Sequence, residues 1–230
     1  MSEPDILQKP MDTTAHSGQP LDARKERLLL MVLAAIQFTN ILDFVIIMPL
    51  GPQFMRVFGV GSQEFGLIVS SYTFSSGFFG LVGAFFIDRF DRRASLLTLY
   101  TGFAIGTGMC ALAPDYILLV AARVLTGVFG GVLASVILSI VGDVIPYERR
   151  GTAMGVIMSS FSLASVIGVP IGLYIATQFG WHWTFISLAG SSALILLFAS
   201  RVVPSIQGHM SAATVRNPVE TMKVMLLNKN

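Results

Sequence analysis

Long apolar runs separated by short polar segments dominate the pattern of this chain. Each run is close to the ~20 residues that an α-helix needs to cross the hydrocarbon core of a bilayer. The pattern therefore predicts an all-α membrane protein with six transmembrane helices. The expected spans cover approximately residues 28–50, 65–87, 94–113, 116–141, 152–177 and 183–203.

Composition agrees with this pattern. Of the 230 residues, 53% are hydrophobic and only 12% are charged, and the mean hydropathy is +0.72. A soluble domain has about 25% charged residues. The formal net charge is only +2, and the charges gather between the apolar runs, so nothing here indicates nucleic-acid binding.

The two ends of the chain have a different composition. Residues 1–23 mix Pro, Ser, Thr, Gly and acidic residues with few large apolar ones, which predicts a disordered tail. Residues 24–203 hold the predicted six-helix bundle. Residues 204–230 are expected to form a linker with a short amphipathic helix that starts near Asn217 and lies on the inner membrane face.

Basic residues alternate along the chain and predict its orientation. The segments assigned to one side contain Arg24, Lys25, Arg27, Arg89, Arg92, Arg93, Arg149, Arg150 and Arg201. The segments assigned to the other side, near 51–64, 113–115 and 178–182, contain only Arg56. Because short cytoplasmic loops carry the excess of Lys and Arg, we expect both termini to be cytoplasmic.

Two ionisable residues fall deep within predicted spans. Asp43 lies about seven residues before the outer end of the first span, and Arg123 about seven residues after the outer start of the fourth. At ~1.5 Å per residue, both lie roughly 10 Å below the outer surface. Equal depth and opposite charge predict a pair, either direct or through water.

The pair has two interpretations. One is a structural ion pair that joins two helices. The other is a titratable or substrate-binding site in a water-filled cavity, which is how charges within a membrane commonly act. Gln37, Thr39 and Asn40 extend the polar surface from Asp43, either as a cavity wall or as interhelical hydrogen bonds.

Glycines recur within the spans at four-residue spacing, at Gly102 and Gly106, Gly127 and Gly131, and Gly168 and Gly172. Small residues at this spacing let helix backbones approach closely in lipid, so helix packing is their expected role. Pro170 lacks a backbone donor and is expected to kink the fifth span.

The segment between the second and third spans carries a recognisable motif. Residues 84–93 read AFFIDRFDRR, which resembles the signature G-x-x-x-D-R-x-G-R-R of the major facilitator superfamily. Asp88, Arg89, Arg92 and Arg93 match, whereas Ala84 and Asp91 replace the two glycines. Residues 143–151, DVIPYERRG, look like the matching loop after the fourth span.

The resemblance implies a role for these loops. In the family they form a cytoplasmic gate in which basic residues pair with nearby acids. Asp143 is then a candidate partner for Arg89 or Arg92, and Arg149 and Arg150 belong to the same gate. The alternative is that these charges only set the topology of the chain.

Three further segments resemble motifs of the same superfamily. Arg123, within residues 119–131, resembles a fourth-span motif linked to proton transfer, and residues 42–52 are similar to a first-span motif of drug:proton antiporters. Gly168-Val-Pro170-Ile-Gly172 partly matches an antiporter motif of the fifth span, with Val169 where Gly is common. The resemblance implies half of a major facilitator fold, built from 3+3 inverted repeats.

The function implied is secondary active transport, with proton-coupled efflux of small drug-like or sugar-like molecules by alternating access. A symporter or uniporter of the superfamily, or a non-transporting six-span binding or assembly partner, are the alternatives. No enzyme, metal site or cofactor is expected; a proton gradient would supply the energy. The expected location is the bacterial inner membrane. Because the family has twelve spans, the expected partners, besides lipid and substrate, are a missing C-terminal half, which we favour, or a parallel second copy.

Overall fold

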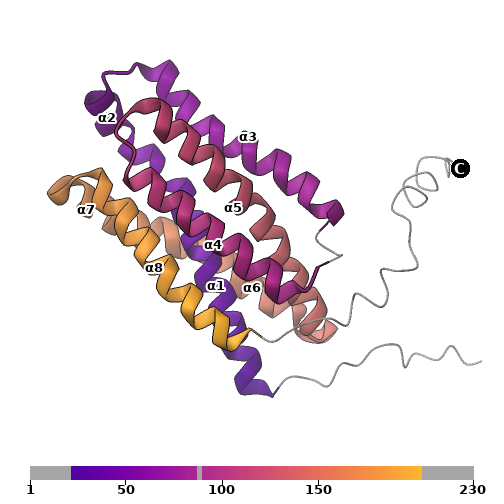
Figure 1. Cartoon of the computed structure of the whole chain (residues 1–230). Helices are drawn as coiled ribbons and strands as arrows, with labels where there is room; N and C mark the ends of the chain where they lie inside the picture. The colour runs from indigo at the N-terminus through magenta and orange to yellow at the C-terminus, as the bar shows by residue number, and fades with distance from the viewer. Residues whose placement is uncertain (1–21, 87–89, 204–230) are drawn as a thin grey trace, which may run out of the picture.

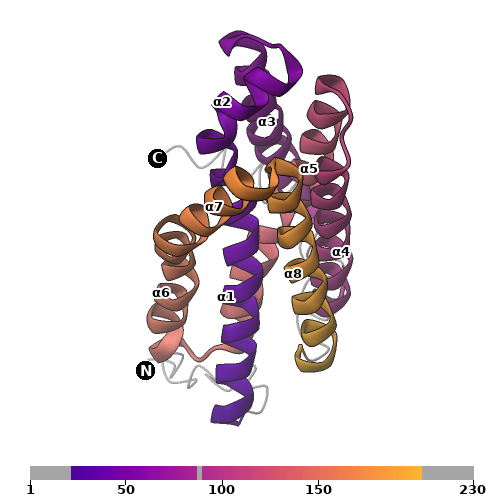
Figure 2. The same cartoon turned by 90° about the vertical axis from the view of Figure 1, so that its left-hand side faces the viewer.

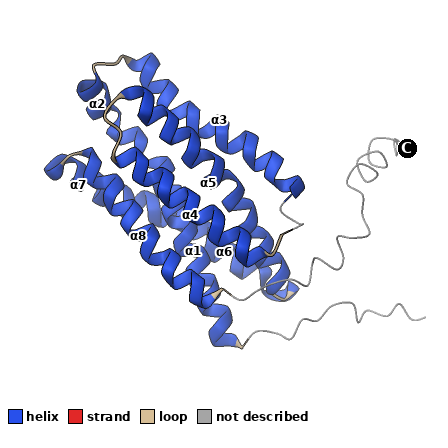
Figure 3. Ribbon diagram, in the orientation of Figure 1, coloured by secondary structure: helices blue, strands red, loops and turns tan. Residues whose placement is uncertain are grey.

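The computed structural model describes residues 22–86 and 90–203. Within these ranges the backbone forms helices joined by short turns, and no residue there is in a strand (Figure 3). Six helical segments in the described ranges are long and apolar enough to cross a membrane. The prediction of a six-span, all-α membrane protein is therefore confirmed.

Some spans consist of more than one helical segment. The first span is α1 followed by α2, and the fifth is α6, a π-helical turn η2 and α7 (Figure 1). The bounds are α1 Ala23–Val45, α2 Ile47–Phe58, α3 Ser62–Phe86, α4 Arg92–Ala111, α5 Tyr116–Val144, α6 Tyr147–Leu163, η2 Ala164–Gly168, α7 Val169–Phe179 and α8 Trp181–Val202.

The helices extend further than the apolar runs. Residues 51–58, predicted as part of a loop, belong to α2, which ends at Gly59 in the left-handed conformation. Asp143 lies within α5, and Arg149 and Arg150 lie within α6, so these predicted loop residues are helical. Hydropathy marks only the part of a helix that lipid covers, whereas the backbone hydrogen bonds continue into the polar interface.

The two tails lie largely outside the described residues. Ala23, expected in the disordered tail, is already the first residue of α1. The rest of the predicted tail and the predicted amphipathic helix near Asn217 fall outside the described ranges.

Pro170 marks the expected irregularity in the fifth span. It lies in the first turn of α7, directly after the π-helical turn Ala164–Gly168. Because proline cannot donate to the preceding turn, the wider turn accommodates the lost hydrogen bond. The chain bends between α6 and α7 (Figure 2).

The glycine pairs mark close helix contacts, as predicted. A Cβ atom on Gly127 would lie only 2.6 Å from the carbonyl oxygen of Tyr72, and one on Gly131 would overlap the carbonyl of Ser76. This close approach joins α3 and α5, which run side by side (Figure 1). Cβ atoms on Gly168 and Gly172 would meet side chains of the first span at 2.9 Å.

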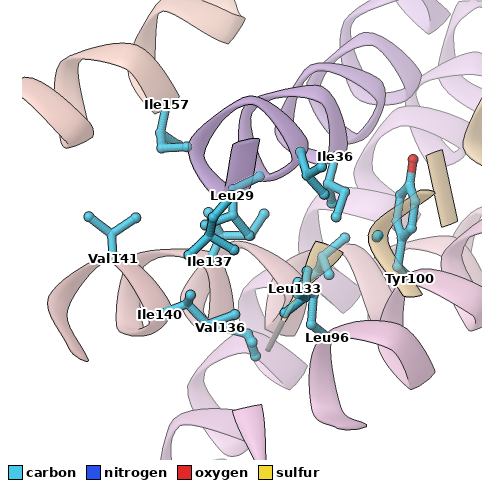
Figure 4. Packing of buried hydrophobic residues seen from close by; sticks show 14 of the residues in the cluster. Leu29, Ile36, Leu96, Tyr100, Leu133, Val136, Ile137, Ile140, Val141 and Ile157 are labelled. Atoms are coloured by element: carbon cyan, nitrogen blue, oxygen red, sulfur yellow. The ribbon is translucent and has the colours of Figure 1, made fainter. Parts of the chain in front are cut away.

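Two apolar clusters fill the bundle. One lies toward the end where α1 begins, which we call the Ala23 end, and includes Leu29, Ile36, Leu133, Ile140 and Ile157 (Figure 4). The other lies toward the opposite end, where the turn between α2 and α3 lies, and it includes Ile46, Leu50, Phe54, Leu119 and Trp181.

The packing is approximately repeated between the two halves of the chain. The first span packs against the fifth through α1 and α6, and the fourth packs against the second through α5 and α3. Helices α4 and α8, the third and sixth spans, pack against each other. This pattern is what two inverted three-helix repeats produce.

Candidate functional site

Asp43 and Arg123 form a direct ion pair between the two apolar clusters. The Asp43 Oδ2 atom lies 2.6 Å from Arg123 Nη1, and the side chains of Asp43 and Arg123 are 0% and 1% exposed. Arg123 Nη1 also lies 3.4 Å from the Asp43 carbonyl oxygen. The predicted pairing is therefore confirmed in its direct form, whereas its role remains a prediction.

Polar groups around the carboxylate complete the site. The hydroxyl of Thr107 on α4 donates to the other carboxylate oxygen, Asp43 Oδ1, at 3.3 Å. One turn further along α4, Cys110 Sγ lies 3.8 Å from the Thr126 hydroxyl on α5. Three spans therefore meet at the pair.

Tyr72 on α3 covers the guanidinium group. The Arg123 Cζ atom lies 4.3 Å from the centroid of the Tyr72 ring, a geometry that attracts a cation to the π face. The same ring stacks with Phe44, with centroids 5.5 Å apart and planes 27° apart. The Tyr72 hydroxyl donates to Asn40 Oδ1 at 3.0 Å.

Asn40 fixes this arrangement to α5. Its amide nitrogen donates to the carbonyl oxygen of Gly130 at 3.1 Å. A Cβ atom on Gly130 would lie 2.7 Å from the Tyr72 hydroxyl and 2.8 Å from Asn40 Oδ1. Glycine at this position therefore leaves the space in which Asn40 and Tyr72 meet.

The polar residues beside Asp43 have different surroundings. Thr39 lies 2.9 Å from the Tyr100 hydroxyl, and Asn40 bonds to α3 and α5, so both make interhelical hydrogen bonds. Gln37 is partly exposed, and its buried Oε1 atom has no hydrogen-bond partner among the described residues. The alternative of a polar cavity wall therefore still applies to Gln37.

Sequence reasoning missed Tyr72, Phe44 and Thr107. Aromatic and hydroxyl residues are frequent in the spans of this chain, which has 17 Phe and 5 Tyr. Nothing in the sequence distinguishes these three from residues that face lipid. A weak signal is available for Phe44, because it is the neighbour of Asp43.

Arg123 depends on Asp43 for its charge partner. Among the described residues, Asp43 is the carboxylate that pairs with Arg123, and the Arg123 Nε atom has no hydrogen-bond partner there. If a proton added to Asp43, the electrostatic attraction would fall and Arg123 would be left buried with an uncompensated charge, which is costly in an apolar interior. Protonation would therefore favour a conformation in which Arg123 meets water or an anionic group.

Part of the predicted gate at the Ala23 end is also paired. Arg92 Nε bonds to Asp143 Oδ2 at 2.9 Å, which confirms one of the two partners expected for Asp143. Arg93 donates to the carbonyl oxygen of Ser200 on α8. Asp88 and Arg89 lie outside the described residues.

The loop residues near α6 make further contacts. Arg149 pairs with Glu26 of α1 at 3.0 Å, a partner that the sequence did not indicate. Arg150 Nε donates to the carbonyl oxygen of Ile145 at 2.9 Å. The pair of Arg149 and Glu26 holds the beginnings of the first and fifth spans together.

Asp91 has a clear local role where the family signature has glycine. Its carboxylate accepts a hydrogen bond from the backbone N–H of Ala94 at 3.1 Å and caps α4. Its φ angle of −57° does not need glycine. Aspartate is among the best residues at this position of a helix.

The chain matches known proteins over most of its length. Residues 33–229 match the family model of the Major Facilitator Superfamily. An uncharacterized MFS-type transporter, YwfA of Bacillus subtilis (strain 168), is 36% identical over 145 residues, which cover 61% of this chain and 34% of that protein. A probable sugar efflux transporter of Mannheimia succiniciproducens is 27% identical to this chain. The match covers 87% of this chain and 50% of that protein.

Solved structures agree with the fold. A bacterial homolog of the human lysosomal transporter Spinster, in an inward-facing and occupied conformation, superposes with a TM-score of 0.70 at 18% identity; the match covers 80% of this chain and 45% of that one. The chain thus spans about a third to a half of the curated relatives named above. On the family match and the fold, this six-span membrane chain belongs to the major facilitator superfamily.

Proposed function

We propose that this chain is one half of a proton-coupled secondary transporter that exports small organic molecules by alternating access. The observation that carries the proposal is the buried pair of Asp43 and Arg123, 2.6 Å apart. Charges at this depth are expensive and are usually retained for function. The pair joins the first and fourth spans, so it links helices from both three-helix repeats.

The proposed cycle uses the pair as a switch. A proton that adds to the Asp43 carboxylate weakens the contact with Arg123, and loss of that proton restores it. Because the pair spans two helices, its making and breaking can favour different packing of these helices. Coupling requires only that substrate binding favours one protonation state over the other.

The relatives support export without identifying the substrate. The Mannheimia protein named a probable sugar efflux transporter is 27% identical to this chain. Family membership favours transport over catalysis. Bacterial relatives such as the Bacillus protein support a place in the bacterial inner membrane. The basic residues near the Ala23 end support its position at the cytoplasm.

The exposed faces of the bundle support a requirement for further spans. Only 17% of the apolar, membrane-spanning stretch of α3 is buried within the bundle. The exposed residues of α3 include Ser70 and Thr73. On α6, Ser159 and Ser162 are exposed as well. Polar side chains of this kind are better placed against protein or a water-filled cavity than against lipid tails. We therefore propose that a C-terminal half, or a second parallel copy, covers these faces.

The partner can be tested by measuring the mass of the protein in the membranes of its source cell. A denaturant-resistant species of about twice the mass of this chain would support a covalently linked second half. A species of the mass of this chain that cross-links to itself in parallel would support a second copy. An isolated, transport-inactive monomer would refute both and favour a six-span assembly partner.

Coupling can be tested with Asp43→Asn in the full-length protein. In inverted vesicles with an imposed pH gradient, we would measure movement of ethidium and of radiolabelled methyl glucoside. The wild type should move at least one probe only when the gradient is present, and the variant should lose that dependence. Asp115→Asn is the matched control, because Asp115 is an exposed aspartate that caps α5. Gradient-driven transport that is unchanged in Asp43→Asn would refute the coupling role.

A further inference from the structure

Exposure increases stepwise from the ion pair to the surface of the bundle along one line of contacts. Asp43 is 0% and Arg123 1% exposed, Tyr72 is 5% exposed, and Phe44 is 37% exposed. Arg123 contacts the Tyr72 ring, and that ring contacts Phe44. Two aromatic rings therefore lie between the buried charges and the exposed face of α1.

Buried apolar side chains lie beyond the pair toward both ends of the bundle. Toward one end of the bundle lie Ile36 and Leu133 of the cluster near Ala23. Toward the other end lie Ile46, Leu119 and Ala122. Water that enters along the helix axes would have to cross these clusters. The aromatic side reaches an exposed side chain, Phe44, through two ring contacts.

One partly exposed polar residue, Gln37, lies on the same helix as Phe44. Gln37 lies two turns before Phe44 and therefore on the same face of α1, with Asn40 between them. The buried Oε1 atom of Gln37 has no hydrogen-bond partner among the described side chains. A polar group of this kind at membrane depth indicates a water-lined or protein-lined face of α1, because an unsatisfied group in lipid is costly.

We propose that Tyr72 and Phe44 form an aromatic cover over the pair, through which water and protons reach Asp43 from the face of α1 that carries Gln37. In this role both are positioning residues. The hydrogen bond from Tyr72 to Asn40 holds the cover closed, and the contact with Arg123 links its position to the state of the pair. Removal of a proton from Asp43 strengthens the pair and draws Arg123 back beneath the ring.

The surroundings of the carboxylate are consistent with this role. The titratable and charged groups that act on Asp43 are Arg123 on α5, Tyr72 on α3 and Cys110 on α4. Within the described residues, α6, η2, α7 and α8 contribute no charged partner to it. Proton access to Asp43 therefore depends on the movement of groups that the cover contacts.

The chain supplies its own reporter of water access. Cys110 is the only cysteine in the sequence and is fully buried. It lies one turn along α4 from Thr107, which binds Asp43, and it contacts Thr126, one turn along α5 from Arg123. A charged, membrane-impermeant methanethiosulfonate reagent should modify Cys110 only when water reaches this layer.

The experiment compares labelling rates in the full-length protein, with any cysteine beyond this chain replaced by serine. Phe44→Ala and Tyr72→Phe should each raise the rate of Cys110 labelling about three- to tenfold, the change in open population expected when one aromatic or hydrogen-bond contact is lost. Phe44→Tyr keeps the ring and should restore the wild-type rate. Phe74→Ala, on the exposed face of α3, and Tyr100→Phe, a buried tyrosine that bonds to Thr39, are the matched controls and should not change the rate.

The second measurement is the pH profile of gradient-driven transport. Tyr72→Phe should shift this profile, whereas Tyr100→Phe should leave it in place. Wild-type labelling and a wild-type pH profile in both Phe44→Ala and Tyr72→Phe would overturn the cover. An equal rise in labelling for the control variants would also overturn it, because general loosening of the bundle would then explain the result.

This inference rests on the proposed function, but the two can fail separately. If Asp43→Asn retains gradient-driven transport while Phe44→Ala accelerates Cys110 labelling, the coupling role is wrong and the cover is supported. If Asp43→Asn abolishes coupling while labelling is unchanged in both cover variants, the coupling role is supported and the cover is wrong.

Discussion

Removing one charge of the central pair should destabilise the protein more than removing both. Asp43 and Arg123 are fully buried, and within the described ranges each forms its salt bridge with the other. Breaking a buried ion pair by removing one partner costs about 3–5 kcal/mol in soluble proteins. Replacing both partners with neutral groups leaves no uncompensated charge and is often close to neutral.

The two single variants should not be equivalent. In Asp43→Asn, Arg123 keeps its charge, because arginine is effectively never deprotonated in proteins. In Arg123→Met, Asp43 can bind a proton and become neutral. We therefore expect a loss of about 3 kcal/mol for Asp43→Asn, a smaller loss for Arg123→Met, and recovery of most of the stability in the double variant.

The assay is thermal unfolding of the purified protein in detergent. A loss of about 3 kcal/mol corresponds to a fall of about 6–12 °C in Tm by the scaling for chains of 150–250 residues. A double variant as unstable as Asp43→Asn would refute the reasoning, since uncompensated charge would not then be the cause. Equal stability of all four proteins would show that the pair is hydrated.

Three further pairs of substitutions test other contacts of the bundle by the same unfolding assay. Gly127→Ala should lower the stability by about 1–3 kcal/mol, because the new Cβ atom would lie 2.6 Å from a carbonyl oxygen of α3. Gly155→Ala is the control and should be neutral or stabilising, because the space beside Gly155 is open. Equal effects of the two variants would contradict the close packing. Arg149→Ala should destabilise more than Glu26→Gln, because the first leaves a carboxylate that is 10% exposed without its partner and the second leaves an arginine that is 51% exposed; the reverse order would show that the pair is hydrated. Gly59→Ala should cost about 1 kcal/mol and Gly59→Asn less, because the φ angle is +64°, and an alanine variant as stable as the wild type would show that the turn relaxes.

The sequence contained enough information for the spans and for the central pair. Six apolar runs predicted six spans because lipid requires continuous apolar surface along a helix. Asp43 and Arg123 were identifiable because charges are rare at membrane depth, and counting residues from the span ends placed them at the same level. The contact of 2.6 Å confirms this inference from spacing alone.

The parts of the site that the sequence did not reveal depend on rotation of the helices around their axes. Whether Tyr72 points to Arg123 or to lipid is set by the packing of α3 on α5, which brings the two backbones together at Gly127 and Gly131. The partner of Arg149 was missed for a similar reason, because Glu26 lies near the start of α1 and only the tertiary fold brings α6 beside it. The helices extend beyond the predicted apolar runs because the helical turns at the membrane interface need no apolar side chains.

The opposite directions of two helices give a physical reason why the pair lies where it does. Helices α1 and α5 are the first helices of the two inverted repeats, so Asp43, near the end of α1, lies level with Arg123, near the start of α5. An acid on one helix and a base on the other therefore attract the two repeats to each other. Any rearrangement that slides α1 along α5 must therefore break the contact between Asp43 and Arg123. Neutralising both partners would lower the cost of that step, because neither charge would then be left buried without its partner.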